Sequence, residues 1–212
     1  TLYNFKSTRS VTLEMMIRHS ISVRQGISDS LMIVDMPYNT YNKPSQALKN
    51  CKKVMKLTKC DAIKIEGGFK KIKVIKHLIK NNIPVMGHLG LLPQSTKGKF
   101  KSKGKSIKER NELIRDCKIL ENAGVFSIVL ECVESKLARQ ITNTIKIPTI
   151  GIGSSKNCDG QILVIDDILG LTESKMKFVK KFVDVKKLIA YGAKKFKKEI
   201  KSKKYPSYKY SY

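Results

Sequence analysis

The chain has 212 residues, of which 41% are hydrophobic and 28% are charged. That length can bury one sizeable hydrophobic core and is too short for two large ones, so a single domain is expected. The net charge of +26 would suit a nucleic-acid-binding protein, but 37 of the 43 basic residues are lysines spread over nearly every predicted helix. No predicted strand carries the aromatic pairs that stack on bases, so we expect solvated helix faces rather than a nucleic-acid partner.

The cysteines and the apolar runs bear on the cellular compartment. The cysteine count is odd and no CxxC pair occurs, which argues against a disulfide framework or a zinc site and fits a reducing compartment. No apolar run approaches the ~18 residues of a membrane span, and no signal peptide opens the chain. We therefore expect a soluble, cytoplasmic protein without a membrane partner.

The first elements in chain order are a helix and a short strand. Thr12 is a typical N-cap, and the helix that it opens is predicted to reach about Gly26. A strand over residues 31–34 follows and ends at Asp35. Ser45 is then predicted to cap the second helix.

The next elements repeat this alternation. A strand over residues 62–65 ends at Glu66, and a helix with apolar residues on one side covers residues 69–79. The strand at residues 84–86 then ends near His88. Each predicted strand is thus followed by a polar residue that could serve chemistry.

A capping box opens the longest predicted helix of the second half. Ser106 and Glu109 have the spacing of such a box, and the helix is predicted to stop at Gly124. A strand over residues 125–130 ends at Glu131 and leads to another amphipathic helix.

The last predicted strands lie in the final third of the sequence. One covers residues 147–150, and a sixth, over residues 162–165, ends at Asp166. Residues 201–212 form a basic, Tyr-rich tail.

Six strands alternating with helices predict a parallel α/β fold. We expect a (β/α)8 TIM-type barrel over residues 1–200 that lacks its first two strands in this chain, since a complete barrel typically takes ~250 residues and eight strands. An open doubly wound sheet is the competing geometry. Its dinucleotide-binding form would need a GxGxxG turn after the first strand, which is absent.

Polar residues at the strand ends are the candidate site, because the carboxyl ends of parallel strands meet at one edge. A single carboxylate there is commonly a helix cap, whereas several that converge indicate a binding site. The strand ends carry Asp35, Glu66, His88, Glu131 and Asp166.

Two further patterns leave alternatives open. Lys64 lies two residues before Glu66, so both side chains face the barrel interior, either as a structural ion pair or as a carboxylate-binding lysine beside a metal-binding glutamate. His88 lies between glycines, where it could be a hydrogen-bonded core residue or a ligand-binding one. The glycines between residues 151 and 160 make an anion-binding loop conceivable, but that motif is weak.

Several segments resemble ketopantoate hydroxymethyltransferases, in that family's order and near its spacing. They cover nearly the whole chain, and HLGLLPQS and CDGQ are the most specific parts. The segments are VDMPY (34–38), KIEGG (64–68), PVMGHLGLLPQS (84–95), VLECV (129–133), IPTIGIGSS (147–155) and CDGQILVIDDILGL (158–171).

The resemblance implies a specific reaction in the biosynthesis of pantothenate and coenzyme A. Members of the family are Mg2+-dependent (β/α)8 barrels, often decameric, that use 5,10-methylenetetrahydrofolate to convert 3-methyl-2-oxobutanoate into 2-dehydropantoate. By the same resemblance Asp35 and Glu66 would hold the magnesium, and Glu131 would be the general base. Lys64, His88 and Asp35 would bind the keto acid.

The resemblance also has a gap. The family's upstream GDSLG motif, which supplies a metal-binding Asp and a substrate-binding Ser, has no counterpart in this sequence. Two alternatives therefore stay open: a related Mg2+-dependent barrel enzyme acting on another α-keto acid, and an inactive truncated chain with a binding role.

Overall fold

A computed structural model describes residues 3, 5, 7–96, 101–174 and 176–212. Part of the basic loop after His88, residues 97–100, lies outside these ranges. The contacts divide the chain into two units, Thr1–Ile162 and Leu163–Tyr212, which are described one at a time. The single domain expected over residues 1–200, with a tail at 201–212, stays a prediction.

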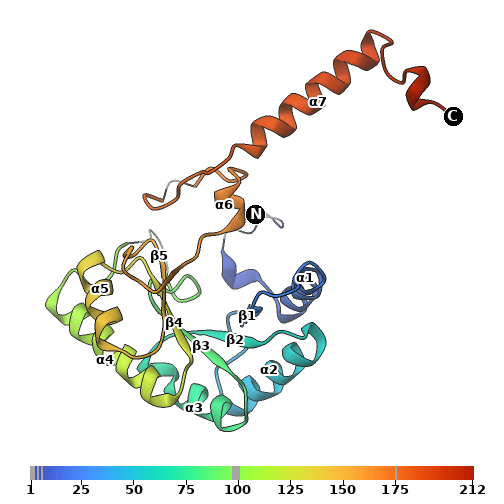
Figure 1. Ribbon diagram of the computed structural model, residues 1–212. Coiled ribbons are helices and arrows are strands. Elements are labelled where there is room, and N and C mark those ends of the chain that lie inside the picture. Colours follow the sequence, from blue (N-terminus) through green and yellow to red (C-terminus); the bar gives the residue numbers. More distant parts are fainter. Residues whose placement is uncertain (1–2, 4, 6, 97–100, 175) are drawn as a thin grey trace. The chain divides into compact units, whose positions relative to one another are not determined.

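One parallel sheet organises the first unit (Figure 1). Its strands are β1 (Ile33–Asp35), β2 (Ala62–Glu66), β3 (Val85–Gly90), β4 (Ser127–Glu131), β5 (Thr149–Ile152) and β6 (Gly160–Gln161). Every pairing is parallel, and the strands follow one another in sequence order. A doubly wound sheet would reverse its strand order at a switch point, so this curled sheet follows the barrel pattern.

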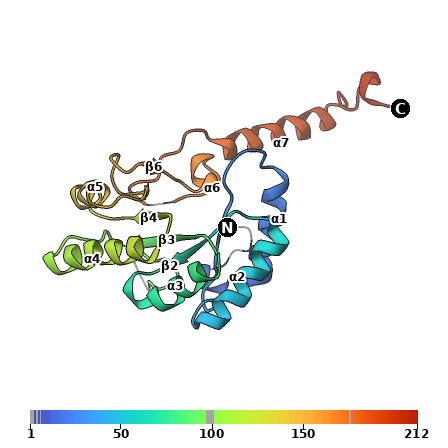
Figure 2. The same ribbon diagram turned by 60° about the horizontal axis from the view of Figure 1, so that its bottom comes forward.

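Five helices cover the outer face of the sheet (Figure 2). They are α1 (Leu13–Gln25), α2 (Pro44–Thr58), α3 (Ile72–Lys80), α4 (Ile107–Ala123) and α5 (Ser135–Thr144). Consecutive helices contact one another, and α2 to α5 each connect two adjacent parallel strands. The core between helices and sheet includes the fully buried side chains Ile63, Ile65, Ile75, Leu78, Leu120, Ile128, Leu130, Leu137 and Ile141.

Most helix ends follow the sequence signals, with one exception. Thr12 and Ser106 accept hydrogen bonds from the backbone N–H three residues on, as predicted for N-caps. The prediction for Ser45 is wrong: α2 begins at Pro44 after the N-cap Lys43. Proline suits the first position of a helix because its fixed φ is helical and its missing N–H is not needed there.

The predicted sixth strand is also wrong in place and extent. The strand at this edge is Gly160–Gln161, and the chain leaves the sheet after Ile162 donates to the Gly151 carbonyl. Beyond this strand, the side chains of Ile162, Val164 and Ile165 are each more than half exposed, so these residues lack the burial that would stabilise a strand.

The second unit is helical within its described residues. Asp166 lies in the first turn of α6 (Ile165–Ile168), where carboxylates favour a helix N-terminus, and not at a strand end. The long helix α7 (Val185–Lys201) follows.

In the described part of the chain, no helix is both long enough and apolar enough to cross a bilayer.

Candidate active site

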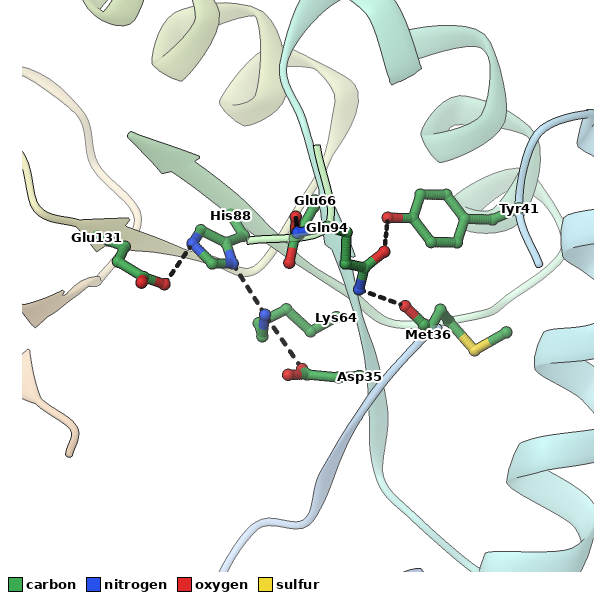
Figure 3. A network of polar contacts seen from close by, with 8 residues as sticks. All are labelled: Asp35, Met36, Tyr41, Lys64, Glu66, His88, Gln94 and Glu131. Atoms are coloured by element: carbon green, nitrogen blue, oxygen red, sulfur yellow. Dashed lines mark hydrogen bonds and ion pairs between the residues drawn. The ribbon is translucent and has the colours of Figure 1, made fainter. Parts of the chain in front are cut away.

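Five of the residues singled out from the sequence come together at the carboxyl edge of the sheet (Figure 3). Strand register explains why: Asp35 is opposite Lys64, Glu66 is opposite His88, and the last residue of β3 is opposite Glu131. Side chains alternate along each strand, so Lys64 and Glu66 share the face turned away from the helices, as predicted.

A chain of contacts links four of these residues. Lys64 Nζ lies 3.2 Å from Asp35 Oδ1 and 2.9 Å from His88 Nδ1. His88 Nε2 in turn lies 3.1 Å from Glu131 Oε2. The lysine and its neighbours therefore form one electrostatic unit that spans strands β1 to β4.

The protonation of His88 follows from its partners. Burial lowers the pKa of His88, which outweighs the nearby Glu131 carboxylate and keeps the ring neutral. The ammonium group of Lys64 can only donate, so Nδ1 accepts and the ring proton is on Nε2. That N–H faces Glu131 but is not aligned for a hydrogen bond with any described group. Nε2 is thus a buried donor beside the Glu131 carboxylate without a well-aligned acceptor among the described residues.

Glu66 is a buried carboxylate with an unusual proton affinity. Only 7% of the residue is exposed, and burial raises its pKa to about 7 even though Lys64 and the backbone N–H of Gln94 favour the charged form. Its Oε2 accepts from Gln94 N at 3.1 Å. Its Oε1 makes no hydrogen bond or ion pair with the described residues, so that oxygen is available to a ligand.

Sequence reasoning missed two residues of this network, Tyr41 and Gln94. Both are almost fully buried and lie in segments that follow strands, where an isolated Tyr or Gln has no distinguishing pattern. The position of Gln94 inside the HLGLLPQS segment was the one available signal.

The carboxylates fit magnesium better than a transition metal. Within the described residues, no three His, Cys, Asp or Glu side chains are grouped closely enough to hold a metal ion by themselves. Mg2+ characteristically takes one or two protein carboxylates and fills its other positions with water and substrate. Glu66 has a free oxygen and a raised pKa, and a nearby dication would stabilise its charged form. Asp35 is half-exposed and pairs with Lys64 through Oδ1.

A cavity of about 460 Å3 borders Glu66 and Gly90. It opens between the segment after β2 and the start of α4, and its lining includes Phe69, Leu92 and Lys103. Its volume is in the range of small-molecule pockets, about 300–1,000 Å3, and of the five site residues Glu66 lines it.

The glycine-rich segment after β5 is explained by packing. Added Cβ atoms would lie 2.8 Å from Ile150 at Gly160, and 3.0 Å from Gln161 at Gly151. Ser154 Oγ donates to the Leu130 carbonyl and accepts from the backbone N–H of Val133, which follows β4. The hydroxyl thus ties two loops together, and the anion-binding hypothesis gains no support from it.

The chain is similar to known proteins over nearly its whole length. The chain is 60% identical over 211 residues to 3-methyl-2-oxobutanoate hydroxymethyltransferase of Pelagibacter ubique (strain HTCC1062), covering 100% of this chain and 82% of that protein. It is 46% identical to the protein of the same description from Sulfurimonas denitrificans, covering 94% and 77%.

A solved structure supports the fold. The chain resembles 2,3-dimethylmalate lyase, a PEP mutase/isocitrate lyase superfamily member, with a TM-score of 0.53 at 15% identity over 91% of this chain and 68% of that one. The family model for ketopantoate hydroxymethyltransferase matches residues 1–208. The resemblance predicted from the motifs is thereby confirmed: the chain belongs to the ketopantoate hydroxymethyltransferase family.

Proposed function

We propose that this chain transfers a hydroxymethyl group from 5,10-methylenetetrahydrofolate to 3-methyl-2-oxobutanoate, giving 2-dehydropantoate. Family membership supports this reaction. The observation that carries it in the structure is the meeting of three carboxylates, a lysine and a neutral histidine at one edge of the sheet.

In this proposal Asp35 and Glu66 hold magnesium, directly or through water. The ion, when bound, would withdraw electron density from the keto carbonyl and stabilise negative charge on its oxygen. Glu66 must be ionised to contribute, and its raised pKa places that ionisation near neutral pH.

Lys64 binds the carboxylate of the keto acid. Its side chain is 14% exposed and its ammonium group lies between Asp35 and His88, so it is fixed in place before the substrate arrives. The Nε2–H of His88, which lies beside Glu131 without a hydrogen-bond partner in the described structure, is the donor for a substrate oxygen in this proposal.

Glu131 accepts the proton from the carbon next to the keto group. Its side chain is only 13% exposed and lies 3.1 Å from the neutral His88 ring, at the end of a strand that borders the other site residues. The resulting carbon nucleophile forms a bond to the methylene carbon of the folate. Both carbon–nitrogen bonds of that methylene bridge break in turn, water supplies the hydroxyl oxygen, and the two folate nitrogens take up the protons released by the keto acid and by water. We propose the cavity beside Glu66 and Gly90 as the place of the co-substrate.

Three broader expectations belong to the same proposal. We propose that the six-stranded sheet is a (β/α)8 TIM-type barrel that lacks its first two strands in this chain, which its unbroken strand order favours. We also propose a homo-oligomer, a decamer by family resemblance, and a cytoplasmic location. The latter agrees with five unpaired cysteines.

Product formation tests the proposal. Purified chain would be incubated with 3-methyl-2-oxobutanoate, 5,10-methylenetetrahydrofolate and Mg2+, and 2-dehydropantoate would be quantified by mass spectrometry. We expect product that depends on all three additions and disappears in Glu131→Gln. Absence of product with the unaltered chain at saturating substrates would refute the proposed reaction.

A further inference from the structure

The candidate metal-binding residues are held by a buried link that family membership does not assign. Gln94 lies in the segment after β3, 8% exposed, and makes three hydrogen bonds to segments distant in sequence (Figure 3). We propose that Gln94, oriented by Tyr41, is the positioning residue that sets the geometry of the magnesium site. This inference rests on the proposed function.

Each hydrogen bond of Gln94 has a separate consequence. Its backbone N–H donates to Glu66 Oε2 at 3.1 Å, which fixes one oxygen of that carboxylate. Its side-chain Nε2 donates to the Met36 carbonyl at 2.9 Å. Because Met36 directly follows Asp35, the same residue controls both carboxylates.

Tyr41 determines which way the amide of Gln94 points. The phenol O–H donates to Gln94 Oε1 at 2.7 Å, and Tyr41 is 4% exposed. With the amide reversed, Gln94 Oε1 would face the Met36 carbonyl, and two acceptors would meet in a buried place. The hydroxyl thus selects the orientation that joins the segment after β3 to the end of β1.

This rigidity matters because magnesium is geometrically demanding. Mg2+ requires nearly octahedral coordination at about 2.0–2.1 Å, so carboxylates on separate loops must be held in fixed relative positions. Groups that orient metal ligands typically change metal affinity by about 10–100-fold when removed. Gln94 contacts one ligand-bearing strand end through its backbone and the other through its side chain.

Substitution of the side chain alone tests the link. In Gln94→Met the side chain has a similar length, and the backbone N–H still donates to Glu66. The side-chain hydrogen bonds to Met36 and Tyr41 are lost. We expect the dissociation constant for Mg2+ alone, measured by titration calorimetry, to rise about 10–100-fold. Tyr41→Phe should raise it by about three- to tenfold, and the double variant should bind no more weakly than Gln94→Met, since both changes break one link.

A matched control separates positioning from general loop stability. Gln46 also ties down the loop after β1, accepting from Asn42 N and donating to the Asn39 carbonyl, without touching the site. Gln46→Met should leave magnesium affinity within about twofold of the unaltered chain. Thermal midpoints of all variants would be recorded, because a purely structural role would lower the midpoint and leave the affinity of the folded protein unchanged.

The outcomes distinguish this inference from the proposed function. If the unaltered chain binds Mg2+ and both Gln94→Met and Tyr41→Phe bind it equally well, the positioning role is wrong and the proposed function stands. If the unaltered chain shows no heat of magnesium binding at any concentration, the metal role and this inference fail together.

Discussion

Replacing Glu66 with glutamine should stabilise the metal-free protein at alkaline pH. Burial raises the pKa of Glu66 from 4.5 to about 7, so the folded state favours the protonated form. Because the pKa is raised on folding, this group stabilises the fold most at pH values below 4.5. That contribution is lost as the pH rises through 7.

The size of the effect follows from the shift. One pKa unit corresponds to about 1.4 kcal/mol, so ionised Glu66 costs about 3 kcal/mol of unfolding free energy at pH 8 and about 1 kcal/mol at pH 5. Glutamine has nearly the same shape, its carbonyl can accept from Gln94 N, and it carries no charge at either pH.

Urea unfolding in the presence of EDTA would measure this difference. We expect Glu66→Gln to be more stable than the unaltered chain by up to about 3 kcal/mol at pH 8, with a smaller gain near pH 5. If Glu66→Gln is no more stable than the unaltered chain at pH 8, Glu66 is not a desolvated carboxylate that destabilises the metal-free protein when ionised.

Three further predictions concern the same site. Lowering the pH from 8 to 6 should weaken Mg2+ binding about tenfold, because the ionised fraction of Glu66, with a pKa of about 7, falls by that factor. A pH-independent affinity measured by calorimetry would exclude Glu66 as a ligand. Glu131→Gln should slow proton abstraction from the keto acid by about 10²–10⁴-fold and leave Mg2+ affinity nearly unchanged. If NMR spectra show that the proton next to the keto group still exchanges with deuterium at the original rate, Glu131 is not the base. Lys64→Met should raise the KM for 3-methyl-2-oxobutanoate by at least about tenfold in steady-state assays, since a charged hydrogen-bond donor is lost. An unaltered KM would show that Lys64 does not bind the substrate.

The site could be anticipated because parallel strands impose strict geometry. Once a strand was recognised by its apolar residues, alternation placed Lys64 and Glu66 on one face and strand order placed Glu131 on the same edge. These inferences need no knowledge of side-chain contacts.

The parts that could not be anticipated depend on tertiary context. The apolar run after Gln161 has strand composition, but it is exposed and turns into α6, which periodicity alone does not distinguish. The roles of Tyr41 and Gln94 arise from hydrogen bonds between residues more than 50 positions apart. Local pattern carries no information about such pairs.

The most direct test of the account is deuterium exchange into 3-methyl-2-oxobutanoate, which needs no folate. In D2O, NMR should show loss of the proton next to the keto group when both the chain and Mg2+ are present, and no loss after EDTA. No exchange at saturating Mg2+, or exchange that survives removal of the metal, would contradict a site in which carboxylates from neighbouring strands bind one cation and activate a 2-oxo acid.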